Sequence, residues 1–175
     1  KLHQEAILTI NEILKIKKHF VLLTNAPRPN ETVRIFLEKM GLEKKIRDHV
    51  FTSGEAALNY LKKNHPTEKF YHIGPPKDTD LFSSFKNNQS KNIDNSDYLL
   101  CTGLFDNHKS DLNYYRELLE KYCHKKMICS NPDLIVDRGD KRELCAGSVA
   151  MLFEKLGGEV TVSYTHLRAH ETIDD

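Results

Sequence analysis

Residues 20–28 read Phe-Val-Leu-Leu-Thr-Asn-Ala-Pro-Arg, and the fold predicted for the whole chain is organised around this stretch. Its leading apolar residues do not alternate with polar ones, which is typical of a strand covered on both faces in a parallel sheet. The run ends at Thr24 and Asn25, Pro27 imposes a turn, and Asn30 is expected to cap a helix. Open α/β sheets bind ligands at such strand ends, and helix N-termini favour anions. The local pattern fits an anion site and an ordinary turn without a ligand equally well.

The composition is that of a globular protein. The chain has 175 residues, of which 39% are hydrophobic and 29% charged, and 26 Lys and Arg against 25 Asp and Glu give a net charge of +1. This balance argues against binding to nucleic acid or to a membrane surface, since both depend on an excess of basic residues. The sequence shows no membrane span, no signal peptide and no C-x-x-C pair among its four cysteines. We therefore expect a cytoplasmic protein with buried, reduced thiols, and its oligomeric state stays unknown.

Segments with helical and strand patterns alternate along the chain. Helical spacing marks residues 4–18, 33–40, 53–65, 115–122 and 148–156, and short apolar runs mark strands at 20–23, 50–52, 70–74, 98–101 and 127–129. This alternation predicts an α/β fold with a mainly parallel sheet. We expect two sheets with a seam near residues 64–69, and Ser53 as the cap of the third helix. The turn 137–140 predicts a hairpin.

Six short segments together resemble the class IIA branch of the haloacid-dehalogenase-like hydrolases, which contains the NagD-type phosphatases. The segments are Leu22–Arg28, Phe51–Gly54, Tyr71–Gly74, Thr102–Asp106, Ser130–Asp133 and Cys145–Ser148. None of them is specific alone. Their order and spacing hold from about residue 2 to residue 160, which argues against chance similarity.

This resemblance implies a partial Rossmann-like core, built on a parallel sheet, with an inserted α/β cap domain of the C2 type. Residues 1–66 would form the first part of the core, residues 67–147 the cap, and residues 148–160 the return into the core. Members of the family hydrolyse phosphomonoesters through an aspartyl-phosphate, and Mg²⁺ neutralises the phosphoryl oxygens. The implied partner is a small phosphorylated metabolite.

The resemblance also assigns roles to five residues. Thr24 matches the motif whose hydroxyl holds a phosphoryl oxygen, and Asn25 can add its backbone N–H. Arg28 is close enough in sequence to be a second phosphate contact. Asn131 and Asp133 match an Asn-Pro-Asp segment of the cap that lies towards the substrate entrance in relatives.

The chain departs from the family pattern at both ends. An Asp-x-Asp nucleophile motif should precede the first helix, but residues 1–3 are Lys-Leu-His. After residue 160 the family's Gly-Lys-Pro and its later acidic pair are missing, and residues 161–175 resemble a translated adaptor, so we exclude them as a non-native tail. We therefore expect the central portion of a Mg²⁺-dependent phosphatase, inactive by itself, without a catalytic nucleophile or metal ligands. The alternative is a non-catalytic module that binds a small molecule or nucleotide on the same scaffold.

Several motif-like groups are better explained without a functional site. His166 and His170 have the helical spacing of zinc ligands but lack further ligands, and Asp174-Asp175 follow the last helix too closely to be the family's acidic pair. The tripeptide 138–140 reads as part of the hairpin turn rather than as an adhesion motif.

Three further predictions concern single residues of the central region. His72 is expected to be a core or cap-face histidine rather than a general acid. Cys129 and Cys145 are expected to be small core hydrophobes, and Asp106 a turn residue rather than a substrate contact.

Overall fold

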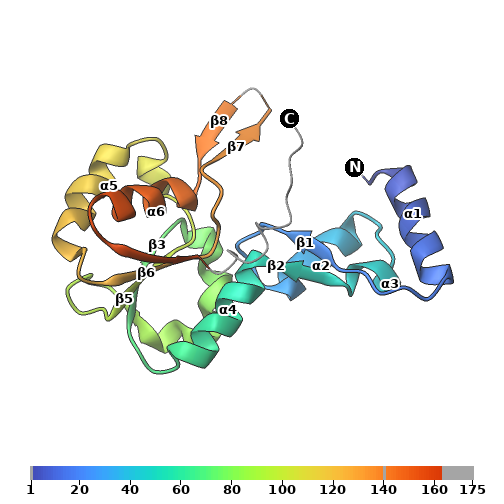
Figure 1. The fold of residues 1–175 in the computed structure, drawn as a ribbon, viewed down its shortest axis with the longest axis horizontal. Coiled ribbons are helices and arrows are strands. Elements are labelled where there is room, and N and C mark those ends of the chain that lie inside the picture. The colour runs from blue at the N-terminus through green and yellow to red at the C-terminus, as the bar shows by residue number, and fades with distance from the viewer. Residues whose placement is uncertain (1, 140, 163–175) are drawn as a thin grey trace.

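The computed structural model describes residues 2–139 and 141–162, and it is elongated, with two units side by side along its long axis (Figure 1). We call residues 2–52 the N-terminal unit and residues 70–162 the C-terminal unit. Helix α4 (Ser53–Asn64) connects them. None of the helices in the described ranges has the length and apolarity needed to cross a bilayer.

The N-terminal unit is small. It contains α1 (Gln4–Lys15), β1 (Leu22–Thr24), α2 (Asn30–Lys39), α3 (Lys44–Arg47) and β2 (Val50–Thr52). Strands β1 and β2 form a parallel pair in which Thr24 is the register partner of Thr52. Two strand ends that carry hydroxyl groups therefore lie next to each other, as the carboxyl ends of parallel strands must.

The C-terminal unit holds the larger sheet, and all five of its strands are parallel in the order β4-β3-β5-β6-β9. Its elements are β3 (Phe70–Ile73), η1 (Pro76–Asn88), β4 (Gln89–Ser90), β5 (Tyr98–Cys101), η2 (Asp106–His108), α5 (Leu112–Leu119), η3 (Glu120–Tyr122), β6 (Lys126–Cys129), β7 (Ile135–Arg138), β8 (Lys141–Leu144), α6 (Ala146–Lys155) and β9 (Glu159–Val162). The predicted α/β class is confirmed, and the described residues hold two parallel sheets beside the two-stranded β7–β8 hairpin.

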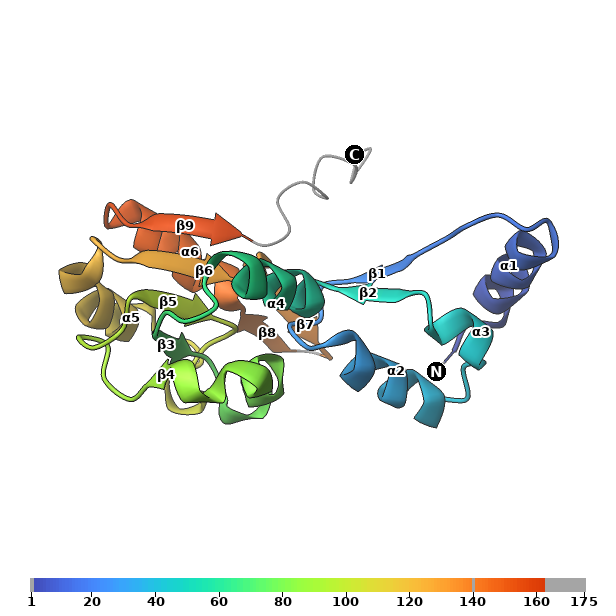
Figure 2. The same cartoon turned by 90° about the horizontal axis from the view of Figure 1, so that it is seen from below.

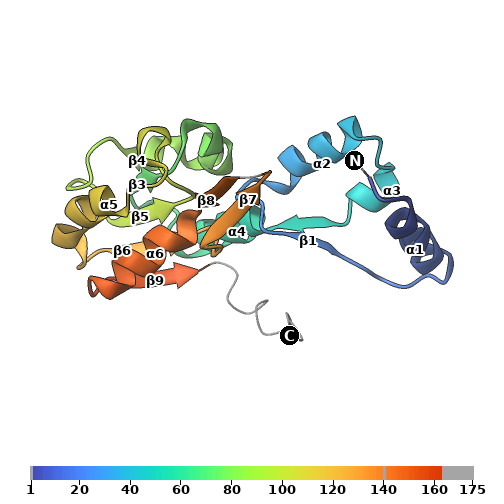
Figure 3. The same ribbon diagram turned by 90° about the horizontal axis from the view of Figure 1, so that it is seen from above.

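Alternate residues of β5 and β6 point to opposite faces of this sheet, as the pleat requires. Leu99 and Met127 pack with residues of α5 and α6 on one face. Leu100 and Ile128 pack with residues of α4 and η1 on the other. Figures 2 and 3 view this three-layer arrangement from below and from above. Both faces are covered, so residues 98–101 of β5 and 127–129 of β6 are buried, as these unbroken apolar runs predict.

Strand β1 differs from its prediction. Val21 and Leu23 are 59% and 49% exposed, although the apolar run predicted a strand covered on both faces. In the described residues β1 pairs with β2 alone, α2 packs beside this pair, and α1 buries none of its residues. An apolar run shows that a strand can be buried, but burial itself depends on the neighbours that pack on it.

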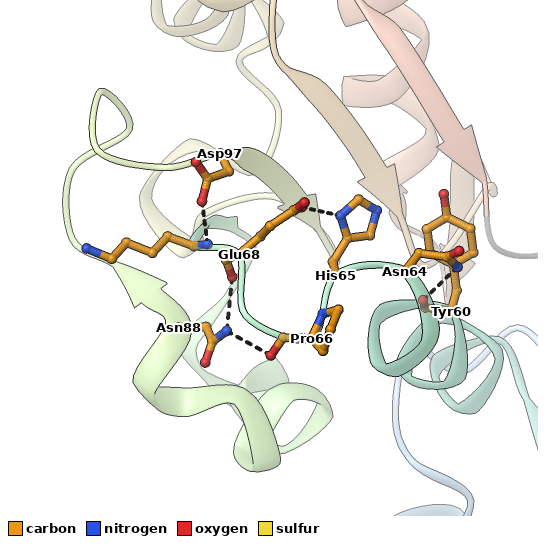
Figure 4. Close-up of polar contacts among 8 residues, drawn as sticks. Tyr60, Asn64, His65, Pro66, Glu68, Asn88 and Asp97 are labelled. Atoms are coloured by element: carbon orange, nitrogen blue, oxygen red, sulfur yellow. Dashed lines mark hydrogen bonds and ion pairs between the residues drawn. The ribbon is translucent and has the colours of Figure 1, made fainter.

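The connection between α4 and β3, where the seam was predicted, is fastened to the C-terminal unit (Figure 4). The side chain of Asn88 donates to the backbone carbonyls of Pro66 and Glu68, at 3.3 and 3.1 Å. The carboxylate of Asp97 accepts a hydrogen bond from the backbone N–H of Lys69 at 2.7 Å. The segment between the two sheets is therefore held in place by hydrogen bonds rather than being a loose linker.

Residues 148–160 lie in the C-terminal unit, with residues 70–147 and not with residues 1–66. Strand β9 pairs in parallel with β6, and Met127 is the register partner of Val160. Val149 and Phe153 of α6 are fully buried in the core of the C-terminal unit. The apolar stripe of this helix covers one face of the five-stranded sheet, which has more apolar area to offer than the N-terminal unit. The assignment of the two units as core and cap stays a prediction.

The predicted hairpin is present. Strands β7 and β8 are antiparallel, with Ile135 opposite Leu144, and Gly139 supplies the positive φ of +61° that the tight turn needs. The hairpin lies near the junction of the two units (Figure 3). Arg138 ends β7 and Gly139 lies in the turn, whereas Asp140 lies outside the described residues, as do His166, His170 and Asp174-Asp175.

Candidate functional site

A cavity of about 410 Å³ lies where the carboxyl end of β1 meets the C-terminal unit. All five residues that the sequence singled out line it: Thr24, Asn25, Arg28, Asn131 and Asp133. Thr24 is the last residue of β1 and Asn25 and Arg28 lie in the loop after it, whereas the other two come from the loop after β6. Two segments more than a hundred residues apart in sequence thus form facing walls of one site.

The loop after β1 forms the first wall. The hydroxyl oxygen of Thr24 accepts a hydrogen bond from the backbone N–H of Ala26 at 3.3 Å, which closes a local turn. Accepting this bond leaves the hydroxyl hydrogen of Thr24 available to donate to a ligand. Arg28 follows four residues later and adds a guanidinium group to the cavity lining.

Residues 52–55 hold this loop in place. The Thr52 hydroxyl donates to the carbonyl of Arg28 at 2.5 Å, and the Ser53 hydroxyl donates to the carbonyl of Ala26 at 3.1 Å. The backbone N–H of Gly54 donates to the same Ala26 carbonyl at 3.1 Å. A Cβ on Gly54 would lie 2.3 Å from the backbone nitrogen of Arg28, so only glycine permits this close approach.

The start of α4 differs from the prediction that Ser53 caps it. Thr52 is the N-cap residue, and its side-chain oxygen accepts from the backbone N–H of Glu55 at 2.8 Å. A Glu three residues after such a cap usually bonds back to the cap residue. Here the Glu55 carboxylate accepts from the backbone N–H of Asn30 instead, at 3.0 Å, and the Asn30 side chain accepts from the N–H of Thr52 at 2.9 Å. Asn30 therefore does not cap its own helix as predicted, because its side chain links α2 to β2.

The second wall has a similar construction. Ser148 donates to the carbonyl of Leu134 at 2.5 Å, and the backbone N–H of Gly147 donates to the carbonyl of Asp133 at 3.0 Å. A Cβ on Gly147 would lie 2.1 Å from the carbonyl oxygen of Pro132. The Ala-Gly-Ser segment at the start of α6 therefore fixes the Asn-Pro-Asp loop, as Ser-Gly-Glu at the start of α4 fixes the loop after β1.

One side chain joins the two walls directly. The amide nitrogen of Asn25 donates to both carboxylate oxygens of Asp133, at 3.1 and 3.3 Å. Asn131 stabilises this arrangement, since its side-chain oxygen accepts from the backbone N–H of Asp133 at 3.0 Å. The separation of the walls is thus set by a polar contact between two of the predicted site residues.

A family model of haloacid dehalogenase-like hydrolases matches residues 1–86. Over these residues, almost half of the chain, the sequence is that of a haloacid dehalogenase-like hydrolase.

Among solved structures, a haloacid dehalogenase-like hydrolase from Brucella suis 1330 is 27% identical with a TM-score of 0.76, over 98% of this chain and 68% of that one. A putative NagD protein is 19% identical with a TM-score of 0.69, over 100% of this chain and 71% of that one. A 4-nitrophenylphosphatase from Thermotoga maritima is 19% identical with a TM-score of 0.70, over 100% of this chain and 69% of that one. At such identities the last two likenesses show the fold alone. No curated protein matches the chain.

Magnesium, the cofactor that the family resemblance implies, does not fit the described residues. Their cavity carboxylates are Asp78, Asp106, Asp133 and Glu143, but nowhere in the described ranges do three groups of metal-binding type gather. Asp133 is engaged by Asn25, and Asp106 forms an ion pair with Lys109 at 3.2 Å. Positively charged side chains also line the cavity, among them Arg28 and Lys77.

The other single-residue predictions concerned His72, two cysteines and Asp106. His72 is buried, and its Nε2 lies 2.8 Å from the hydroxyl of Thr102, which agrees with a satisfied histidine. Cys129 is fully buried in the core, but Cys145 is only half-buried and lines the cavity, so the prediction of a core residue is wrong for Cys145. Asp106 begins the exposed η2 turn at the edge of the cavity, as predicted for a turn residue.

Sequence reasoning missed the residues that support the site. Thr52 and Gly54 were recognised only as part of a motif, and nothing in their spacing shows that they contact the loop after β1. Asp78 was missed altogether, although an acidic residue directly after Gly-Pro-Pro-Lys at the end of a strand is a signal that could have been noticed. It is 4% exposed and lines the cavity.

Proposed function

We propose that this chain forms the substrate-binding site of a phosphomonoester hydrolase, with the phosphate at the loop after β1 and the organic part towards the Asn-Pro-Asp loop. The observation that carries the proposal is that Thr24, Asn25 and Arg28 face Asn131 and Asp133 across one cavity. The phosphatase named among the structures of similar fold supports the same activity class.

The chemistry of the first wall suits a phosphate. Thr24 offers a hydroxyl donor and Arg28 a guanidinium, which is the side chain best adapted to phosphate oxygens. Both groups lie between the end of a strand and the start of α2, where backbone N–H groups favour anions. The second wall suits an anion poorly, because Asp133 is a carboxylate. A phosphomonoester would therefore enter with its charged end towards Thr24.

The chain by itself is expected to bind such an ester without hydrolysing it. None of the carboxylates that line the cavity belongs to the loop that holds Thr24 and Arg28. This leaves the non-catalytic binding module as the competing function, and the distinction rests on turnover. We expect no release of p-nitrophenol from p-nitrophenyl phosphate by this chain, with or without Mg²⁺. Turnover that EDTA abolishes, in protein free of contaminating phosphatase, would contradict this expectation.

Calorimetric titration with p-nitrophenyl phosphate tests the binding proposal. Thr24→Val keeps the β-branched shape but removes one hydrogen bond to a charged group, so the Kd should rise roughly ten- to a hundred-fold. Thr24→Ser restores the hydroxyl and should restore most of the affinity. Thr9→Val, the same change on exposed α1, is the matched control and should leave the Kd unchanged. If Thr24→Val lowers the melting temperature but not the affinity, Thr24 only closes the turn.

A further inference from the structure

Asp78 is a buried carboxylate that the proposed phosphate contacts do not use. It lies in the first turn of η1, is 4% exposed, and lines the cavity together with Thr102 and Gly103. Burying a carboxylate is unfavourable unless hydrogen bonds or opposite charges compensate. Hydrogen bonds or positive charges around Asp78 must therefore compensate for its burial.

A short chain of hydrogen bonds holds Asp78 in position. The Thr102 hydroxyl bonds to the Asp78 side chain and lies 2.8 Å from Nε2 of His72. Burial lowers the pKa of His72 to about 4, so the ring is neutral at pH 7. A neutral ring protonated at Nε2 donates to the oxygen of Thr102, whose hydrogen is then directed to Asp78. Burial raises the pKa of Asp78, while the Thr102 hydroxyl and the charges of Lys77 and Arg28 act in the opposite direction.

The carboxylate keeps room for a ligand. A carboxylate has about four acceptor positions, and Thr102 accounts for one of them. The oxygen Oδ2 lies 3.6 Å from the position that a Cβ on Gly103 would take, so the glycine leaves this side of Asp78 without a covering side chain. Gly103 also lies close to Pro75, since the same Cβ would be 3.0 Å from Cδ of Pro75.

We propose that Asp78 selects the substrate by accepting hydrogen bonds from its organic part, so that the preferred ligands are phosphate esters carrying a hydroxyl or ammonium donor. This inference rests on the proposed function, because it needs the phosphate at Thr24 and Arg28. The negative charge of Asp78 repels a phosphate and attracts a donor. The ester is thereby oriented with its phosphate towards Arg28 and its donor groups towards Asp78.

The test measures the Kd values of the full chain by calorimetry for glycerol 3-phosphate, phosphoethanolamine, propyl phosphate and inorganic phosphate. The first two carry hydroxyl and ammonium donors, and the last two lack a donor on an organic part. Asp78→Asn keeps the shape and an oxygen that can accept from Thr102, but it removes the charge. Asp94→Asn removes an exposed charge of the same unit away from the cavity and serves as the control. Melting curves verify that each variant is folded.

We expect Asp78→Asn to weaken binding of at least one donor-bearing ester by about tenfold or more, since a hydrogen bond to a charged group is lost. The difference between glycerol 3-phosphate and phosphoethanolamine shows which donor is used. Propyl phosphate and inorganic phosphate should bind unchanged or somewhat more tightly, because a repelling charge has gone. Thr102→Val, which releases the carboxylate from its fixed orientation, should weaken the same donor-bearing ester to a smaller degree.

Two results would overturn the inference in different ways. If all ligands weaken alike in Asp78→Asn, the carboxylate only positions Arg28, and the proposed function stands without the selectivity. If the unmodified chain binds none of the four ligands, the proposed function fails and the inference fails with it.

Discussion

The two units are built from the same kinds of sequence pattern but differ in how completely they are buried. The central strands of the C-terminal unit are covered by α5 and α6 on one face and by α4 and η1 on the other. In the N-terminal unit, Val21, Leu23, Ile35 and Phe36 are exposed, and α1 and α2 bury none of their residues. A strand–helix pattern thus gives a closed core only where enough layers are present, because a two-stranded sheet has too few neighbours to cover it.

The largest expected effect of this difference is on local unfolding. In limited proteolysis, cleavage should begin within residues 2–52 and leave a resistant product that contains the sheet of the C-terminal unit, because regions with few buried apolar contacts open first. Mass spectrometry of the products identifies the sites. A resistant core mapping to residues 1–66, with the C-terminal unit digested first, would contradict the comparison.

Matched leucine substitutions sharpen the comparison. Leu100→Ala removes a fully buried side chain from β5 and should lower the free energy of unfolding by about 2–5 kcal/mol. Leu23→Ala makes the same change in β1, where the residue is 49% exposed, and should lower it by less than about 1 kcal/mol. Urea denaturation of both variants measures the two values. Equal losses would show that β1 is as well packed as β5.

Acid should affect the C-terminal unit through His72. The pKa of this residue is about 4 in the folded protein because of burial, against 6.5 without burial, so the unfolded chain binds the proton first. Stability should therefore fall as the pH falls from about 6.5 to 4, by up to roughly 3 kcal/mol. His72→Gln should flatten this part of the pH profile, which thermal melts between pH 4 and 7 would measure. Asp78, whose pKa burial raises, acts in the opposite direction and is unchanged in the variant. If stability still falls between pH 6.5 and 4 in His72→Gln, titrating groups other than His72 cause the fall.

A smaller contrast between the units is expected at the two glycines that hold the cavity walls. In Gly147→Ala the added Cβ would collide with the backbone of the Asn-Pro-Asp loop in the C-terminal unit. The substitution should lower the free energy of unfolding by about 1–3 kcal/mol. Gly54→Ala forces its Cβ against the backbone of Arg28, which belongs to the less buried N-terminal unit, and should cost less, about 1–2 kcal/mol. Its main effect should be weaker binding of p-nitrophenyl phosphate. The opposite order of the two stability losses would show that the N-terminal wall is the more rigid.

The sequence predicted much of the fold because its signals are local. Short, mainly apolar runs predicted β3, β5 and β6, and the glycine-containing turn predicted the hairpin β7–β8. Six ordered motifs predicted the family, which the family model confirms. The five site residues were chosen on this basis, and the cavity contains all of them.

The tertiary structure alone decided where the units end and what supports the site. The sequence of α6 is compatible with either unit, and only the larger apolar face of the five-stranded sheet places it in the C-terminal one. His72 and Asp78 are close in sequence, but Thr102 follows 30 residues after His72. The three meet because β3 and β5 are neighbouring parallel strands whose carboxyl ends share one edge. Local patterns determine which segments become strands and helices. Which side chains meet depends on the packing of those segments, and that packing is a property of the whole chain.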